Sequence, residues 1–332
     1  MKKLLSIGLA AMLAFGLATT SFAATDDAAG SDNTTGSSTT ATYTDQSTVT
    51  IQKKYKLTND GTTSPAEIFT LKQVGKEVKD GDATEAPDLG TITGAEFIEG
   101  AATVDGTTGD ITVALPNYDK VGVYEYTLKE VAGTTAGVAY YPDNIRLVVT
   151  VINGEDGKLR IAAVHVESEG AKSDTFPNTY SAGSLKVTKT VEGNLGDKDK
   201  YFEFKVKLTG ETGKTYADSF AVSGGSNKAN PTSIKLGEET TFLLKHGDTI
   251  TIANLPYGVK YTVTETAAEG YTTEKTGADG TISAADQIAA FTNTKDGSID
   301  TGVVLNNMPY ILVLAVLAAG VAVFIIRKRR ED

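Results

Sequence analysis

The amino-acid sequence predicts an all-β protein made of two tandem β-sandwich domains. Its 332 residues contain many short runs rich in Val, Ile, Tyr, Thr and Phe, separated by clusters of turn-forming residues. Short strands at such regular spacing are typical of β-sandwiches. A second observation is a set of three strand motifs that occurs twice in the same order, which indicates two copies of one domain. No long amphipathic helix pattern is present, although a short helical turn would fit residues 64–69 or 284–288.

Eight runs in the body of the chain are predicted to be strands, and turn signals lie between them. The turns are marked by glycine or asparagine, which accept the backbone angles of a tight turn, as in Asn153-Gly154 and Asp279-Gly280. The predicted strands are residues 111–115, 123–128, 145–152, 159–166, 202–208, 241–244, 249–252 and 261–264.

The repeated motifs place a charged or amide residue on the core face of a strand. In a strand, residues i, i+2 and i+4 share one face, so Lys53 lies with the apolar Val49 and Ile51. The same count puts every member of the repeat beside apolar or aromatic neighbours. Two ordered sets of this kind predict buried sites and not a solvated surface. The members are Lys53, Glu130 and Asn178 in the first copy, and Lys189, Glu265 and Asn293 in the second.

The repeat also sets the predicted domain boundaries. Each copy opens with its lysine strand and closes with its asparagine strand, which gives domains at residues 46–181 and 182–296. Together they are long enough for two domains of ordinary size.

A lysine, an asparagine and a glutamate held together in a dry core can form a covalent bond. Burial disfavours the charged ammonium and so favours the neutral amine, which is a nucleophile. The amide carbon of asparagine is the electrophile, and a buried protonated carboxyl can polarise the amide oxygen and carry protons to the departing nitrogen. The products are an isopeptide bond and ammonia, formed once per domain without turnover. Two alternatives stay open: a hydrogen-bonded network that does not react, and strands whose parity is shifted so that these residues face water.

The N-terminus has the pattern of a secretion signal. Lys2 and Lys3 form a basic segment, residues 4–17 an apolar segment, and Ser21-Phe22-Ala23 a small-x-small cleavage site, so we predict a signal peptide at 1–23. A transmembrane anchor is the alternative, which the short apolar run disfavours. Residues 24–45 are rich in Thr, Ser, Ala, Asp and Gly, which predicts a flexible leader.

The C-terminal segment, residues 297–332, has the layout of a cell-wall sorting signal. Residues 310–326 are apolar enough for a short transmembrane helix, and the basic tail after it fixes its end in the cytoplasm. The order of a Thr-Gly pair, an apolar span and a basic tail resembles Gram-positive sorting signals, in which a sortase cuts between Thr301 and Gly302. Ser298 and Ile299 replace the usual Leu-Pro, so the class of sortase stays open, and a permanent membrane anchor is the alternative.

The composition excludes several classes of function. The formal net charge is −11, and it becomes −15 when the six basic and two acidic residues of the terminal segments are removed, which argues against nucleic acid or anionic lipid as a partner. Cysteine is absent, and His165 and His246 lie far apart, so neither a zinc site nor a Cys–His nucleophile is expected. We therefore predict no metal, no cofactor and no enzyme activity.

These motifs resemble the streptococcal-type pilin isopeptide-linkage domain family. The resemblance is carried by the paired lysine, Tyr-Thr-x-x-Glu and Phe-x-Asn-Thr motifs, by the loop Gly193-Asn194-Leu195-Gly196-Asp197-Lys198, and by the tail that runs through Met308-Pro309-Tyr310. It implies immunoglobulin-like sandwiches whose first and last strands are covalently joined. Pro177 departs from the family pattern and predicts a bulge. By this resemblance Lys53 pairs with Asn178 assisted by Glu130, and Lys189 pairs with Asn293 assisted by Glu265.

The resemblance implies a structural subunit of a Gram-positive surface pilus, secreted, self-crosslinked, polymerised by sortase and anchored to the cell wall. It also implies that the chain is held in the membrane transiently through its C-terminal helix. Sortase would join Thr301 of one subunit to a lysine of the next. We expect Lys172, six residues before Asn178 in a polar stretch, to be this acceptor, and a plain solvated lysine is the alternative.

The implied partners are sortase, other copies of the same pilin, peptidoglycan, minor pilins and a host surface. The alternative function is a monomeric adhesin of the same fold, anchored to the cell wall or the membrane, which needs no acceptor lysine. A surface hydrolase would require a cleft of converging acidic or histidine residues.

Overall fold

The structure is a computed structural model that describes residues 45–168, 171–173 and 175–297, and all regular secondary structure in these residues is β. The all-β prediction is confirmed. Residues 64–69 and 284–288 contain no helical turn, because strand β2 (Glu67–Phe69) and the start of β22 (Asp286–Thr294) occupy them. Among the described residues no helix is long and apolar enough to cross a membrane. The predicted signal peptide, nearly all of the predicted leader and the predicted helix at 310–326 lie outside the described residues.

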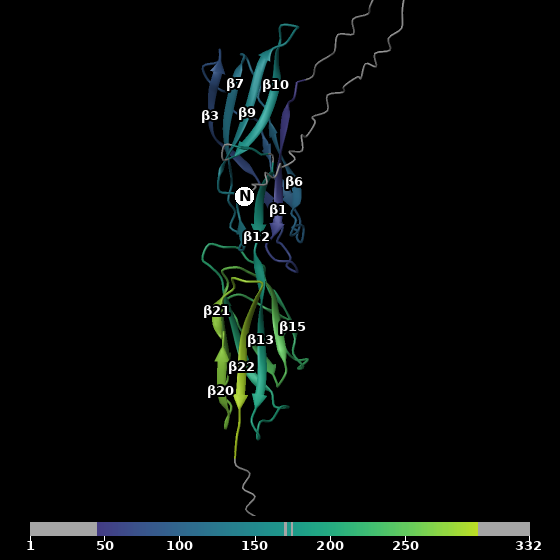
Figure 1. The fold of residues 1–332 in the computed structure, drawn as a ribbon, viewed down its shortest axis with the longest axis vertical. Coiled ribbons are helices and arrows are strands. Elements are labelled where there is room, and N and C mark those ends of the chain that lie inside the picture. Colours follow the sequence, from purple (N-terminus) through teal and green to yellow (C-terminus); the bar gives the residue numbers. More distant parts are fainter. Residues whose placement is uncertain (1–44, 169–170, 174, 298–332) are drawn as a thin grey trace, which may run out of the picture. The chain divides into compact units, whose positions relative to one another are not determined.

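The strands before residue 181 form two five-stranded sheets and a small ribbon, which we call the first strand set (Figure 1). One sheet has the order β4-β6-β1-β12-β8, the other has the order β11-β10-β9-β7-β3, and β2 pairs with β5. Ile51, Tyr126 and Phe176 belong to one hydrophobic cluster to which both sheets contribute. The bounds are β1 Thr48–Leu57, β3 Leu71–Gly81, β4 Ile92–Thr93, β5 Ala95–Phe97, β6 Thr107–Ala114, β7 Gly122–Glu130, β8 Val138–Ala139, β9 Asn144–Asn153, β10 Leu159–Ser168, β11 Ala171–Lys172 and β12 Thr175–Tyr180.

The strands after residue 181 form the second strand set, with a six-stranded and a four-stranded sheet. Their orders are β16-β15-β18-β13-β22-β20 and β17-β14-β19-β21, and a separate hydrophobic cluster that includes Val187, Phe204 and Phe291 lies between them. The bounds are β13 Ala182–Glu192, β14 Phe202–Thr209, β15 Phe220–Gly224, β16 Ser233–Ile234, β17 Glu239–Leu244, β18 Thr249–Pro256, β19 Lys260–Glu265, β20 Thr272–Thr276 and β21 Asp279–Thr281.

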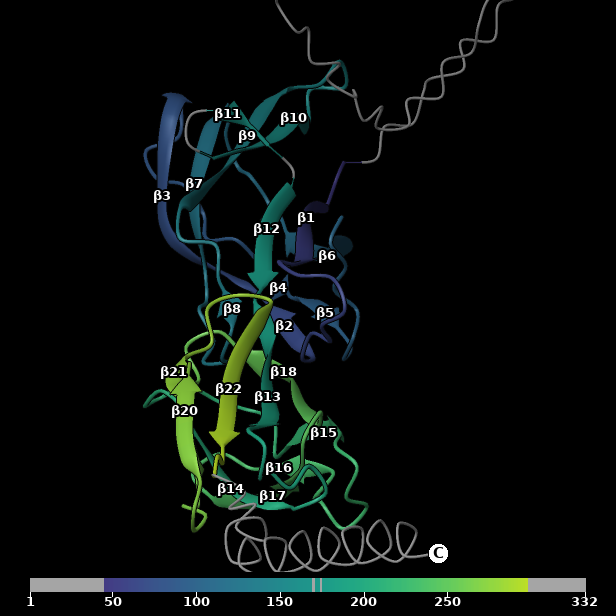
Figure 2. The ribbon, with the colours of Figure 1, turned by 60° about the horizontal axis from the view of Figure 1, so that its bottom comes forward.

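In both strand sets the first strand pairs in parallel with the last. β1 pairs with β12, and β13 pairs with β22, which lie side by side in both ribbon views (Figure 2). Parallel neighbours cannot be joined by a hairpin, and in each set all the other strands lie between the two paired strands in the sequence. This topology brings the lysine strand beside the asparagine strand in each set.

The predicted bulge at Pro177 is wrong. β12 pairs with β1 from Gln52↔Thr175 to Leu57↔Tyr180 without a shift of register. On its other side β12 pairs with β8 only through Thr179 and Tyr180, so Pro177 lies where no ladder bond to β8 is needed.

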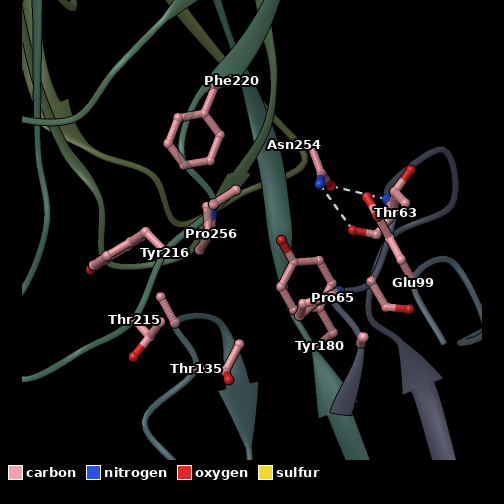
Figure 3. A pocket seen from close by; sticks show the side chains of 14 residues that line it. Thr63, Pro65, Glu99, Thr135, Tyr180, Thr215, Tyr216, Phe220, Asn254 and Pro256 are labelled. Carbon is pink, nitrogen blue, oxygen red and sulfur yellow. Dashed lines mark hydrogen bonds between the residues drawn. The ribbon is translucent and has the colours of Figure 1, made fainter. Parts of the chain in front are cut away.

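Side-chain amides contribute hydrogen bonds between the two strand sets. Asn254 in β18 accepts a hydrogen bond from the backbone N–H of Thr63 and donates one to its carbonyl oxygen, both at 2.9 Å (Figure 3). Asn254 has a φ of 57°, a left-handed conformation that asparagine tolerates better than most residues. Beside this pair lies a pocket of about 330 Å³, lined in part by Pro65, Tyr180 and Phe220.

Candidate functional site

The first predicted trio meets in the core of the first strand set. Lys53 is 1% exposed, and its Nζ donates hydrogen bonds to a carboxylate oxygen of Glu130 and, at 2.7 Å, to Oδ1 of Asn178. Nδ2 of Asn178 donates to the other oxygen of Glu130. Each of the three side chains therefore contacts the other two.

The second predicted trio meets in the core of the second strand set. Lys189 is 1% exposed and Asn293 is fully buried. Nζ of Lys189 donates to both carboxylate oxygens of Glu265, at 2.9 and 3.0 Å, and Nδ2 of Asn293 donates to one of them. Within the described part of the chain, Oδ1 of Asn293 has no hydrogen-bond partner. The carboxylate therefore bridges the amine and the amide.

The register of the strands explains why the two sites have the same layout. In the parallel pairs, Lys53 lies opposite Phe176 and Lys189 lies opposite Phe291, so the asparagine of each trio is two residues further along on the same face. Each glutamate comes from the facing sheet, at the end of β7 or β19. The alternative of shifted parity, with these residues facing water, is excluded, because five of the six residues are buried and the side chain of the sixth, Glu265, is 2% exposed.

Aromatic rings line both sites. Nζ of Lys53 lies 5.3 Å from the ring centre of Phe69 and 5.6 Å from that of Tyr141. Nζ of Lys189 lies 4.2 Å from the ring centre of Phe202 and 5.7 Å from that of Phe204.

Burial in these surroundings changes the acidity of both lysines. Removal from water lowers the pKa of Lys53 and of Lys189, and this effect outweighs the opposing influence of Glu130 and Glu265. A lowered pKa increases the fraction of neutral amine, which is the nucleophilic form. The arrangement thus brings together an amine with a lowered pKa, a side-chain amide and a carboxylate that hydrogen-bonds to both.

The remaining predicted residues are not part of the two trios. Lys172 lies in β11, exposed, opposite Glu167 of β10. Thr301 and Gly302 lie outside the described residues. Within the described part of residues 45–297, no three or more histidine, cysteine, aspartate or glutamate side chains are grouped so that they could bind a metal ion.

Sequence reasoning missed the aromatic walls of both sites. In the first site Leu71 of β3 lies opposite Glu130, and Phe69 is two positions before Leu71. In the second site Phe204 of β14 lies opposite Glu265, and Phe202 is two positions before Phe204. This shared spacing is a signal in the sequence, but it can be recognised only once the strand that faces the glutamate is known.

Comparisons with known proteins relate the chain to a domain family and to a pilin. Residues 21–181 match the family described as the Spy0128-like isopeptide containing domain, and residues 183–295 match a domain of unknown function (DUF7601). A pilin of Streptococcus pyogenes serotype M1 is 27% identical over 347 aligned positions, which cover 96% of this chain and 98% of that protein.

Two further similarities concern a part of a relative and a solved structure. The pilus tip adhesin Cpa of Streptococcus pyogenes is 29% identical over 144 residues, which cover 41% of this chain and 20% of the adhesin. The crystal structure of the major pilin from Streptococcus pyogenes is similar with a TM-score of 0.54 at 24% identity, covering 76% of this chain and all of that one. The chain is homologous to a pilin of Streptococcus pyogenes along nearly its whole length, and its residues 21–181 match an isopeptide-containing domain family, which supports a structural subunit of a pilus.

Proposed function

We propose that the chain is a backbone subunit of a cell-surface pilus, built from two tandem immunoglobulin-like sandwiches that each close an internal isopeptide bond. The observation that carries this proposal is the pair of buried trios, in which a lysine amine and an asparagine amide are bridged by one carboxylate. Each trio connects the first strand of its set to the last.

The reaction balances without any further reactant. Within each hydrogen-bonded ion pair, a proton moves from the lysine ammonium to the glutamate, which produces the neutral amine and the protonated carboxyl together. Nζ then attacks Cγ of asparagine while the carboxyl hydrogen-bonds the amide. The Cγ–Nδ2 bond breaks, the amine proton passes through the carboxylate to the departing nitrogen, and ammonia leaves. The new bonds are Lys53 Nζ–Asn178 Cγ and Lys189 Nζ–Asn293 Cγ.

The position of the bonds suits a protein under tension. Lys53 and Asn178 are 125 residues apart in the sequence, and by analogy with disulfides a covalent closure of this length stabilises a domain by about 5 kcal/mol. A pull along the chain enters the first strand and leaves through the last, so a bond between these two strands lets the force bypass the sheets.

Assembly into a polymer requires an acceptor as well as a donor. The donor by sequence is Thr301, which a sortase would release from Gly302 and join to a lysine amine of another copy. Lys172 fits the acceptor because its side chain is exposed and it lies in a short edge strand, β11, paired on one side only. Sortase, further copies of the chain and the cell-wall peptidoglycan are the partners that this role requires.

Intact-protein mass spectrometry of a recombinant chain of residues 24–301 tests the internal bonds. Two bonds remove two ammonia molecules, so the expected mass is about 34 Da below that of the unmodified chain. Glu130→Ala and Glu265→Ala should each restore about 17 Da beyond the mass change of the substitution, because each removes one proton carrier. A wild-type chain with its full mass would refute the covalent proposal.

Immunoblotting of cell-wall extracts tests the polymer. The wild-type chain should give a ladder of high-molecular-weight bands, and Lys172→Ala should abolish it. Lys158→Ala is the matched control, because Lys158 is a surface lysine of the same strand set with a side chain that is 85% exposed. A ladder that survives Lys172→Ala would assign the acceptor to another lysine, and a wild-type chain found only as a monomer would favour the adhesin.

A further inference from the structure

The loop at residues 193–198 is a motif that the proposed function leaves without a role. It follows the end of β13 and contacts the residues that follow β22. The backbone N–H of Lys295 donates to the carbonyl of Glu192 at 3.1 Å, and that of Leu195 donates to the carbonyl of Lys295 at 3.0 Å. The loop thus extends the pairing of β13 with β22 beyond the last residue of each strand.

The side chain of Asn194 closes this extension. Its Nδ2 donates to the carbonyl of Gly297 at 2.7 Å, and its Oδ1 accepts from the N–H of Gly297 at 3.0 Å. The amide group therefore replaces the backbone of a neighbouring strand. Gly193 permits the approach, because its φ is +88° and a Cβ atom there would lie 2.3 Å from the carbonyl oxygen of Lys295.

A related contact lies beyond the lysine strand of the first strand set. Asn59 follows the end of β1, and its Nδ2 donates to the carbonyl of Ala182, the first residue of β13, and to the hydroxyl of Tyr257, both at 2.7 Å. Ala182 is four residues after the reactive Asn178, and Gly297 is four residues after the reactive Asn293. In each set an asparagine just beyond the lysine strand thus binds the chain beyond the asparagine strand, four residues after the reactive asparagine.

We propose that Asn59 and Asn194 are positioning residues for the two isopeptide bonds, a fourth member of each site. This inference rests on the proposed bond formation. Each side chain fixes the chain just beyond the asparagine strand and so holds the amide carbon beside the lysine amine.

The need for such a contact follows from where the reactive residues lie. Asn293 is the last residue but one of β22, and strand ends open locally more easily than strand centres. A displacement of about 1 Å between reacting groups can slow a reaction by about 100-fold. The contact by Asn194 prevents this displacement in the second set. In the first set β12 continues after one residue into β13, which restrains Asn178 as well, so Asn59 has the smaller effect.

The test measures the rate at which each bond forms in the full chain. The chain is synthesised in a cell-free system, translation is stopped, and samples taken over time are unfolded and digested. Mass spectrometry then quantifies the peptides linked through Lys53 and Asn178 and those linked through Lys189 and Asn293. Each bond serves as the internal control for the other.

Asn194→Ala should slow the second bond by about tenfold or more and leave the first unchanged. Asn59→Ala should slow the first bond by a smaller factor and leave the second unchanged. Asn194→Asp, which keeps the acceptor for the N–H of Gly297 and loses the donor, should form the second bond at an intermediate rate.

Asn230→Ala is the matched control, because it should destabilise the second strand set without displacing Asn293. Asn230 makes the same pair of backbone hydrogen bonds to Leu243, at 2.8 and 3.0 Å, in the same strand set but on another strand. In the Asn230→Ala variant the bond between Lys189 and Asn293 should form at the wild-type rate. Equal rates in Asn194→Ala and Asn230→Ala would overturn the positioning role alone, whereas a wild-type chain that never loses ammonia would overturn the bond and this role together.

Discussion

Replacing Asn293 by alanine isolates the contribution of the second internal bond to stability. In Asn293→Ala, Nζ of Lys189 keeps both hydrogen bonds to Glu265, so no buried charge loses its partner. In Glu265→Ala, by contrast, the ammonium would stay buried without a counter-charge, which costs a further 3 to 5 kcal/mol or so, about as much as the bond itself. The asparagine variant is therefore the cleaner measurement.

The expected loss can be worked out from the length of the closed loop. Closing a loop of about 105 residues stabilises the folded state by about 5 kcal/mol if the entropy of the unfolded chain governs the effect. A domain of about 115 residues has an unfolding entropy of about 0.24 kcal/mol per kelvin, so this loss lowers its midpoint by about 20 °C. Because the entropy depends only weakly on loop length, Asn178→Ala in the longer first loop should lose almost the same free energy.

Differential scanning calorimetry and intact mass, measured on the same preparation, check this expectation. Asn293→Ala should regain about 17 Da beyond the mass change of the substitution, and it should show one transition that moves down by about 20 °C while the other stays. A variant that regains the mass but loses less than about 5 °C would refute the loop-entropy reasoning. A mass deficit that stays at about 34 Da would show that Asn293 is not the electrophile.

Three further predictions concern single side chains. Lys53→Arg should halve the mass deficit, because a guanidinium keeps its proton and is not a nucleophile, and an unchanged deficit in intact mass would contradict this. The variant Asn178→Ala cannot form the first bond, so its Lys53 keeps a free amine. Its free energy of unfolding in urea should rise more between pH 7 and pH 9 than that of the double variant Lys53→Met, Asn178→Ala. Burial lowers the pKa of Lys53 below its ordinary 10.5, so the unfolded chain binds the proton over a range in which the folded chain has released it. An equal change of the free energy of unfolding with pH in the two variants would contradict this prediction. Asn254→Ala should reduce the free energy of unfolding, measured in urea, by roughly 1 to 2 kcal/mol. The variant loses two hydrogen bonds to Thr63, and alanine tolerates a φ of 57° less well than asparagine does. Asn254→Gly should lose less, and the reverse order would show that backbone strain is not involved.

Much of the site could be predicted from the order of residues. The alternation of apolar residues within β1 put Lys53 on the same buried face as Ile51. The second copy of the motif then indicated that the lysine belongs to a set of three residues with a glutamate and an asparagine. The eight predicted strands all lie on strands of the structure, except that the first extends one residue beyond the end of β6. Other strands were missed, among them β3 and β20, because their many lysine, glutamate and threonine residues give no apolar alternation.

Strand parity and a repeated pattern are local properties of the chain, so the amino-acid sequence by itself determined the buried trios and their membership. It did not determine the partners of those strands, because pairing joins residues more than a hundred positions apart and leaves no periodic signal. The parallel register of β13 with β22 places Asn293 diagonally across from Lys189, and the facing β14 places Phe202 against the amine. The same long-range pairing decides the contact of Asn194: in the sequence it is one polar residue of a turn, and in the fold it hydrogen-bonds Gly297, three residues beyond the last strand.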